Sequence, residues 1–297
     1  MTYSIVARDQ KTGDLGVAVQ SHYFSVGSVV TWARSGVGAV ATQSMTEVSY
    51  GPLGLELMAG GKSANEALES LLRSDPRADT RQVGMVDSNG VASAHTGARC
   101  IASAGHVIGD QFSCQANLMS NDSIWGEMEN AFKKNSEMEL PERLVATLEA
   151  AEAAGGDARG KQSTALLVVS SKVYPNYWSG RVMELRVEDD PEPIPELKRL
   201  VQTKRAYEWV EKGDNLLALG KLEESMRAFK KAKDLAPGNE EIGFWVGITL
   251  IGSQNNQKDG REILRETFAR NPNWINVTKS LIEKGYLPKD SVVSELV

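Results

Sequence analysis

The first 45 residues alternate short apolar runs with turn-forming residues, which is the pattern of antiparallel strands. β-Branched and small residues alternate along residues 4–9 and 15–21, and β-branched segments follow at 28–33 and 37–42. Ser35-Gly36 separates the last two segments and supplies a turn. We therefore expect a meander of four strands at the start of the chain.

The apolar period then changes from two residues to that of a helix. Residues 51–60 predict one helix and residues 63–74 a second. Ser63 and Glu66 predict a capping box, in which the Ser63 hydroxyl accepts from the Glu66 amide and the Glu66 carboxylate reaches back. Asp75-Pro76 ends the second helix, because the residue before proline avoids the helical conformation.

Strands and helices alternate again in blocks up to residue 187. Asn89-Gly90 predicts a hairpin turn between strands. The expected strands are 82–87, 91–95, 100–107, 111–119, 163–170 and 181–187, and the expected helices are 123–134 and 141–155. Blocks of like elements favour stacked layers over repeated βαβ units. A four-layer sandwich and an ordinary α+β domain both fit this order, and the pattern alone leaves both open.

Residues 188–196 hold three prolines and five acidic residues, which predicts a stiff, solvated linker. We expect it to separate a domain of residues 1–187 from a helical domain of residues 197–297. Within the latter, residues 205–273 resemble a tetratricopeptide helical hairpin followed by a degenerate copy. The residues that match are Trp209, Gly213, Leu216, Phe229, Ala232, Pro237, then Gly247, Leu250 and Pro272. The resemblance leaves two roles open, a groove for a protein partner and a packing or self-association element.

Charge and composition exclude several functions. The 297 residues include 39 acidic and 33 basic side chains, for a net charge of −6, and no stretch is rich in Lys or Arg. We therefore expect neither nucleic acid nor anionic lipid as a partner. The start lacks a signal-peptide pattern, and no apolar run is long enough to span a membrane. Two cysteines fit a reducing compartment, which predicts a cytoplasmic protein.

Thr2 is the first candidate for chemistry. If Met1 is removed, Thr2 carries a free α-amine with an ordinary pKa near ~8. That amine can take the proton of the Thr2 hydroxyl, so one residue supplies both nucleophile and base. The other interpretation is the plain beginning of a strand.

Five motifs in order resemble a bacterial domain-of-unknown-function family of the N-terminal nucleophile (Ntn) hydrolase-like superfamily. They are MTYSIVARD at 1–9, GVAVQS at 16–21, WARSGVGAVATQ at 32–43, AHTG at 94–97 and GGDxRGxQS at 155–163. Over residues 1–187, the resemblance implies a four-layer αββα sandwich and hydrolysis of an amide bond. It implies Thr2 as the nucleophile, Ser21 as a polar partner, and Arg34 as a cation that lowers the pKa of the amine.

A polar group follows Gly155-Gly156 and leads into an apolar strand. An Asp157–Arg159 pair there either fixes the loop or lines a pocket that binds a carboxylate or amide. Gln162 and His95 are further strand-end candidates for substrate binding.

His95, Cys100, His106 and Cys114 fall within 20 residues. Their spacing matches no standard zinc module, so buried structural roles are one interpretation. Convergence on a zinc ion, or a Cys100–His106 nucleophile–base pair, is the other.

The sequence thus predicts a hydrolase that cleaves an amide or peptide bond of a small substrate and needs no cofactor or metal. A non-catalytic sandwich whose helical domain binds a partner or self-associates is the alternative. A zinc- or cysteine-dependent hydrolase is a third, more distant hypothesis.

Overall fold

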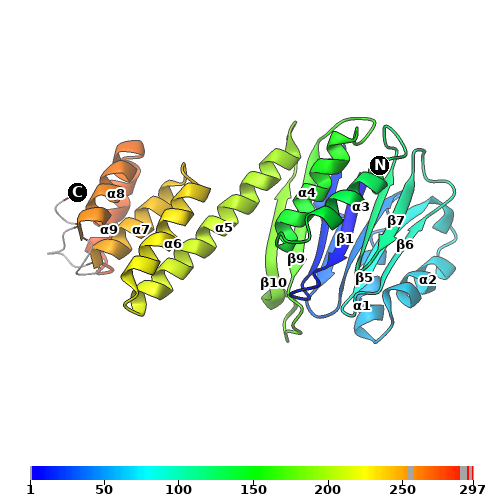
Figure 1. Ribbon diagram of the computed structural model, residues 1–297, viewed down its shortest axis with the longest axis horizontal. Coiled ribbons are helices and arrows are strands. Elements are labelled where there is room, and N and C mark those ends of the chain that lie inside the picture. The colour runs from blue at the N-terminus through cyan, green and yellow to red at the C-terminus, as the bar shows by residue number, and fades with distance from the viewer. Residues whose placement is uncertain (1, 253–256, 288–292, 294–295, 297) are drawn as a thin grey trace. The chain divides into compact units, whose positions relative to one another are not determined.

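The computed structural model describes residues 2–252, 257–287, 293 and 296 (Figure 1). Contacts divide the chain into two compact units, one reaching to Val201 and the other starting at Gln202. The first unit combines two antiparallel sheets with helices, so the α+β class is confirmed.

The larger sheet of the first unit has six strands. Their order is β10 (Arg181–Val187), β9 (Ser163–Val169), β2 (Leu15–Ser21), β1 (Thr2–Arg8), β8 (Phe112–Asn117) and β7 (Gly105–Gly109). The smaller sheet has the order β3 (Thr31–Arg34), β4 (Gly38–Ser44), β5 (Arg81–Asp87) and β6 (Ala92–Thr96). The strand expected at 100–107 is shorter and later, because residues 101–104 form an irregular approach to β7.

Three apolar clusters hold the layers together. Val6, Val17 and Val19 of the larger sheet pack against Ala39, Ala41 and Val86 of the smaller sheet. The outer face of the larger sheet is covered by α3 (Ile124–Lys134) and α4 (Leu140–Ala153), and that of the smaller sheet by α1 (Tyr50–Ala59) and α2 (Ala64–Ser74). The order across the unit is helices, sheet, sheet, helices (Figure 1).

The alternation of strand β1 decides where its polar side chains lie. Tyr3 and Ile5 belong to the cluster beneath α3 and α4, while Val6 belongs to the cluster between the sheets. Because successive side chains of a strand point to opposite faces, Thr2 and Ser4 share the inter-sheet face with Val6. The capping box predicted for α2 is confirmed, with the Ser63 amide donating to Glu66 at 2.8 Å and the Glu66 amide to Ser63 Oγ at 3.3 Å.

The expected linker at 188–196 needs correction, because helix α5 (Pro193–Ala218) begins inside it. Proline fits the first turn of a helix, where its missing N–H has no intrahelical acceptor. Ile194, Leu197 and Val201 are buried in the cluster beneath α4. The first part of α5 is therefore an element of the first unit, and residues of the same helix continue into the second.

The second unit has its own helical core. Besides the end of α5 it contains α6 (Leu222–Leu235), α7 (Glu240–Gly252), α8 (Gln257–Arg270) and α9 (Asn273–Glu283). Phe229 and Val246 lie in one buried cluster, and Phe244, Leu264 and Phe268 in another. Among the described residues, no helix combines the length and apolar character needed to cross a membrane.

Candidate functional site

Thr2 lies where β1 begins, between two neighbouring strands. It pairs with Ser21 at the end of β2 and with Asn117 at the end of β8. The Thr2 hydroxyl donates to Ser21 Oγ at 3.1 Å. Only 3% of the residue's surface is exposed, yet it lines a cavity of about 500 Å³. Cavities of this size are typical of small-molecule sites.

The backbone of Thr2 is fixed from both sheets. Its carbonyl oxygen accepts from Gln43 Nε2 at 3.2 Å and from Asn117 Nδ2 at 3.4 Å. Both amides also donate to Gln82 Oε1, Gln43 at 2.7 Å and Asn117 at 2.8 Å. Since Gln43 and Gln82 belong to the smaller sheet and Asn117 to the larger one, this group joins the two sheets beside Thr2.

The same hydrogen bonding continues through the interior as an inter-sheet amide network, which we define as Ser4, Gln43, Gln82, Gln115 and Asn117. Gln115 Nε2 donates to Ser4 Oγ, and Ser4 donates to Gln43 Oε1, both at 2.7 Å. All five side chains are fully buried. Hydrogen bonds at both the oxygen and the nitrogen restrict the amides of Gln43, Gln82 and Gln115 to one orientation, whereas the buried Asn117 Oδ1 has no partner among the described residues.

The wall of the Thr2 cavity is mixed in character. Its apolar part comes from the segment after β2 and from the loop after β4, namely Tyr23, Val26, Val29, Val30, Met45 and Val48. Its charged part consists of Glu47, Arg77, Arg81 and Arg159. The cavity that Thr2 lines therefore offers both apolar surface and cations.

Arg159 is held in the cavity wall by Asp157. Arg159 Nη2 lies 2.8 Å from Asp157 Oδ2 and Nε lies 3.1 Å from Oδ1. The Asp157 carboxylate is fully buried and also accepts from the amide of His22, which follows Ser21. Gly155 and Gly156 end α4 with positive φ angles of 121° and 58°, which lets the chain turn sharply into this loop.

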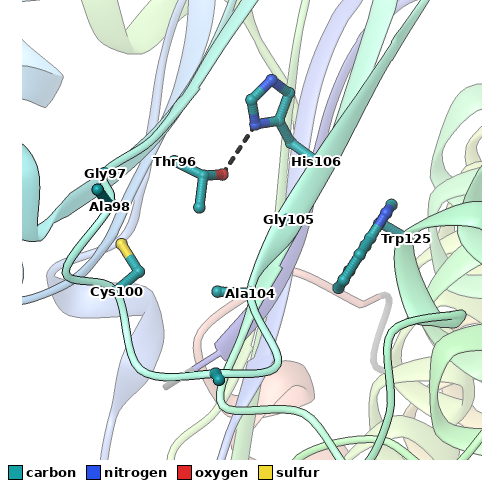
Figure 2. A pocket seen from close by; sticks show the side chains of 9 residues that line it. Thr96, Gly97, Ala98, Cys100, Ala104, Gly105, His106 and Trp125 are labelled. Carbon is teal, nitrogen blue, oxygen red and sulfur yellow. Dashed lines mark hydrogen bonds between the residues drawn. The ribbon is translucent and has the colours of Figure 1, made fainter.

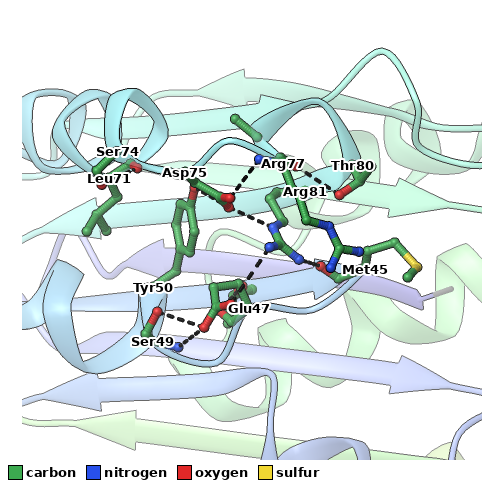
Figure 3. A network of polar contacts seen from close by, with 12 residues as sticks. Met45, Glu47, Ser49, Tyr50, Leu71, Ser74, Asp75, Arg77, Thr80 and Arg81 are labelled. Atoms are coloured by element: carbon green, nitrogen blue, oxygen red, sulfur yellow. Dashed lines mark hydrogen bonds and ion pairs between the residues drawn. The ribbon is translucent and has the colours of Figure 1, made fainter.

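Arg81 belongs to a second charged group of the cavity wall (Figure 3). Its Nε lies 2.7 Å from Asp75 Oδ2, its Nη2 lies 3.7 Å from Glu47, and its Nη1 donates to the Met45 carbonyl. The hydrogen bond from Arg81 holds the pKa of Asp75 below its ordinary value. Hydrogen bonds from Ser49 lower the pKa of Glu47. Both carboxylates are therefore ionised at neutral pH, and burial raises the pKa of the neighbouring Tyr50 phenol.

Comparison with known proteins assigns the first unit to a family. Residues 2–197 match the model described as "Family of unknown function (DUF1028)". The chain belongs to the DUF1028 family. It is also similar to the crystal structure of SPO2555 from Silicibacter pomeroyi, which carries the same family label. The identity is 30%, the TM-score is 0.61, and the match covers 68% of this chain and 84% of the other. No curated protein matches the chain.

The expected resemblance to a family of unknown function is thus confirmed, over slightly more residues than the predicted 1–187. Of the candidates named from sequence, this DUF1028 structure brings together Thr2, Ser21, Asp157 and Arg159. Sequence reasoning missed Gln43, Arg77 and Arg81. Gln43 closes one of the family-like motifs, but nothing in that motif indicates that its amide reaches another sheet.

Arg34 does not lie beside Thr2, and that expectation is corrected. Arg34 pairs opposite Gly38 at the start of β4, whereas Gln43, which contacts Thr2, lies near the end of that strand. The antiparallel pairing of β3 and β4 places Arg34 at the far end of the sheet. There its guanidinium lies 3.1 Å from Glu56 and lines a different cavity.

His95 and Gln162 also lie outside the lining of the Thr2 cavity. A ring nitrogen of His95 lies 2.8 Å from the Ala78 carbonyl oxygen. Gln162 Nε2 donates to Asp189 at 3.2 Å on the surface. Both contacts fix loops, so neither supports the substrate-binding role expected from sequence.

The predicted cysteine and histidine cluster does not form a common centre. Within the described residues, no group of three or more His, Cys, Asp or Glu is arranged to hold a metal ion. Cys114 lies in the apolar core, where burial raises the pKa of its thiol. Cys100 and His106 line one cavity of about 520 Å³ (Figure 2). There, however, Cys100 Sγ donates to the Arg81 carbonyl at 3.3 Å, and His106 Nδ1 lies 2.8 Å from Thr96 Oγ1.

Proposed function

We propose that this DUF1028 protein is an N-terminal nucleophile-type hydrolase that cleaves an amide bond of a small substrate, with Thr2 as nucleophile after removal of Met1. The observation that carries the proposal is the Thr2 hydroxyl, held 3.1 Å from Ser21 Oγ in the wall of a cavity of about 500 Å³. The helix–sheet–sheet–helix order of the first unit supports the assignment to the Ntn superfamily by analogy of fold.

The proposed chemistry uses the new terminal amine as a base. The amine takes the hydroxyl proton as Thr2 Oγ1 attacks the substrate carbonyl carbon, and a tetrahedral oxyanion forms. The protonated amine then gives its proton to the leaving nitrogen, the carbon–nitrogen bond breaks, and an ester on Thr2 remains. Water, deprotonated by the same amine, attacks that ester and restores the hydroxyl.

Four side chains would assist this reaction. Ser21 orients the Thr2 hydroxyl. Gln43 and Asn117 hold the Thr2 carbonyl and so limit movement of the nucleophile. Arg159 takes the electrostatic role first expected of Arg34, because a nearby cation disfavours the charged form of the amine and lowers its pKa.

The proposal requires that Thr2 be the first residue of the mature chain. Intact-mass measurement of the purified full chain is expected to show a mass lacking one methionine. A β-lactone that acylates terminal threonine is then expected to add one acyl group, located at Thr2 by peptide mapping. Thr2→Ala abolishes the labelling, whereas Thr12→Ala, which removes an exposed hydroxyl, leaves it unchanged. Retention of Met1, or labelling that survives Thr2→Ala, rules the mechanism out.

A second proposal concerns the helical unit that starts at Gln202, for which we infer a tetratricopeptide-like fold that binds a partner or self-associates. A Cβ at Gly213 would come within 2.3 Å of Phe229, and one at Gly247, 34 residues later, within 2.7 Å of Leu264. The repeated close approach supports two related helical hairpins.

Trp245 on α7 is 42% exposed. If the surface around Trp245 mediates self-association, Trp245→Ser lowers the molar mass of the particles that light scattering measures for the full chain. A monomer in both proteins leaves partner binding as the remaining role.

A further inference from the structure

We infer that the Thr2 cavity takes amides that carry a carboxylate beside an apolar group, and that Arg77 and Arg159 bind the carboxylate. The hydrolysis of such a compound rests on the proposed function, but its binding does not. N-Acylated amino acids with an aliphatic acyl chain are the simplest members of this class.

Arg159 supplies a rigid cation in the cavity wall. Its bidentate pairing with the fully buried Asp157 carboxylate fixes the plane of the guanidinium. About 30% of the Arg159 side chain remains exposed, and it lines the same cavity as Thr2. A planar guanidinium held in one orientation is suited to a carboxylate, which it recognises through directed hydrogen bonds.

Arg77 supplies a second cation from the turn between α2 and β5. Its amide donates to Asp75 and its carbonyl accepts from Thr80, so its backbone is anchored. Within the part of the chain that the structure describes, its guanidinium makes no hydrogen bond or ion pair, although it lines the cavity. Arg81, in contrast, already contacts Asp75, Glu47 and the Met45 carbonyl. Arg77 is thus the cavity cation best placed to gain a partner from a ligand.

Glu47 narrows where the anion can lie. Hydrogen bonds from Ser49 favour its ionised form, and it stands nearest Arg81. Its negative charge repels an anion from that part of the wall. A carboxylate is therefore expected to face Arg77 and Arg159 rather than Arg81.

The apolar part of the ligand follows from the cavity rim. Tyr23 is 54% exposed and Met45 is 51% exposed, and both line the cavity together with Val48. Large apolar side chains that gather at the rim of a pocket typically cover an apolar ligand. We expect the aliphatic acyl chain of the ligand to cover these side chains, while the carboxylate of its amino-acid part reaches Arg77 and Arg159.

Binding to the full-length Thr2→Ala protein tests the inference without any need for turnover. The probes are N-hexanoylglycine and N-hexanoylglycinamide, which differ only in the carboxylate, and calorimetry measures both dissociation constants. We expect the carboxylate to bind about tenfold more tightly, as one charge-assisted hydrogen-bonding pair allows. Arg77→Gln in the same protein is expected to remove most of that difference. Arg73→Gln, which affects an exposed arginine paired with Glu69, leaves it unchanged.

Two further comparisons separate the parts of the inference. Arg159→Lys keeps the charge beside Asp157 and loses the planar fork, so it should reduce the preference for the carboxylate without unfolding the protein. N-Acetylglycine should bind more weakly than N-hexanoylglycine because its acyl group cannot cover the rim. Equal binding of the carboxylate and the carboxamide, or no binding of either, overturns the inference. Labelling of Thr2 by the β-lactone is independent of that result, so the proposed function stands or fails separately.

Discussion

The side-chain amide of Gln43, on the smaller sheet, donates to the backbone carbonyl of Thr2, on the larger sheet, at 3.2 Å. Gln43 Oε1 accepts from Ser4, two residues along the same strand as Thr2. The Gln43 side chain, from the smaller sheet, therefore contacts both the candidate nucleophile Thr2 and a second residue of strand β1 in the larger sheet.

Replacing Gln43 by leucine keeps most of the side-chain volume but removes these hydrogen bonds. Ser4 loses its acceptor, and the Thr2 carbonyl and Gln82 Oε1 each lose one donor. We expect a loss of about 2–4 kcal/mol in the free energy of unfolding, since buried polar groups left without a partner cost about 1–3 kcal/mol each. Urea denaturation measures it. Gln10→Leu is the matched control, because Gln10 is exposed. A change at Gln43 no larger than the control would contradict the role given to the network.

The sequence was informative where one strand or one loop carried the signal. The family resemblance named Ser21 as a polar partner of Thr2, and the register of β1 and β2 pairs the two residues. The Gly155-Gly156 turn likewise indicated Asp157 and Arg159. Gln43 reaches the Thr2 carbonyl, and Arg77 and Arg81 reach the cavity, only through tertiary packing, which no local pattern encodes. Arg34 was misplaced for the same reason, since the sequence shows a strand there but not which end of it faces Thr2.

The position of Arg34 leads to a prediction about the proposed reaction. Arg34→Gln should leave the rate of Thr2 labelling by the β-lactone within twofold of the parent, because Arg34 pairs with Glu56 away from the Thr2 cavity. The free energy of unfolding should change by less than about 1 kcal/mol, as is usual for exposed ion pairs. Arg159→Gln, which removes the positive charge, is the comparison, and it should slow the same labelling. A large loss of labelling in Arg34→Gln would reinstate the role implied by the resemblance.

The Asp75–Arg81 pair predicts how stability depends on pH. The hydrogen bond from Arg81 lowers the pKa of Asp75 in the folded protein, so this contribution is complete above the unfolded pKa of about 4. It is lost as the pH falls through the lower pKa of the folded state, because the unfolded chain takes up the proton first. Asp75→Asn should therefore destabilise the protein at pH 7, and the difference from wild type should shrink below about pH 4. Urea unfolding from pH 7 to 3 measures it, with Glu69→Gln as a surface control. A difference that stays constant across this range would mean that Asp75 contributes only through its shape.

The two cysteines provide a last test of the core. Cys114 is fully buried beneath α3 and its thiol pKa is raised by burial, so little of the reactive thiolate forms. Cys100 is half-buried and lines the cavity shared with Trp125. A chromogenic disulfide reagent should therefore modify one thiol quickly in the native protein and two after unfolding in urea. Cys100→Ser should remove the fast reaction, whereas Cys114→Ala should leave it unchanged and lower stability by creating a small void. Rapid modification of both thiols in the native state would contradict the packing of β8 against α3.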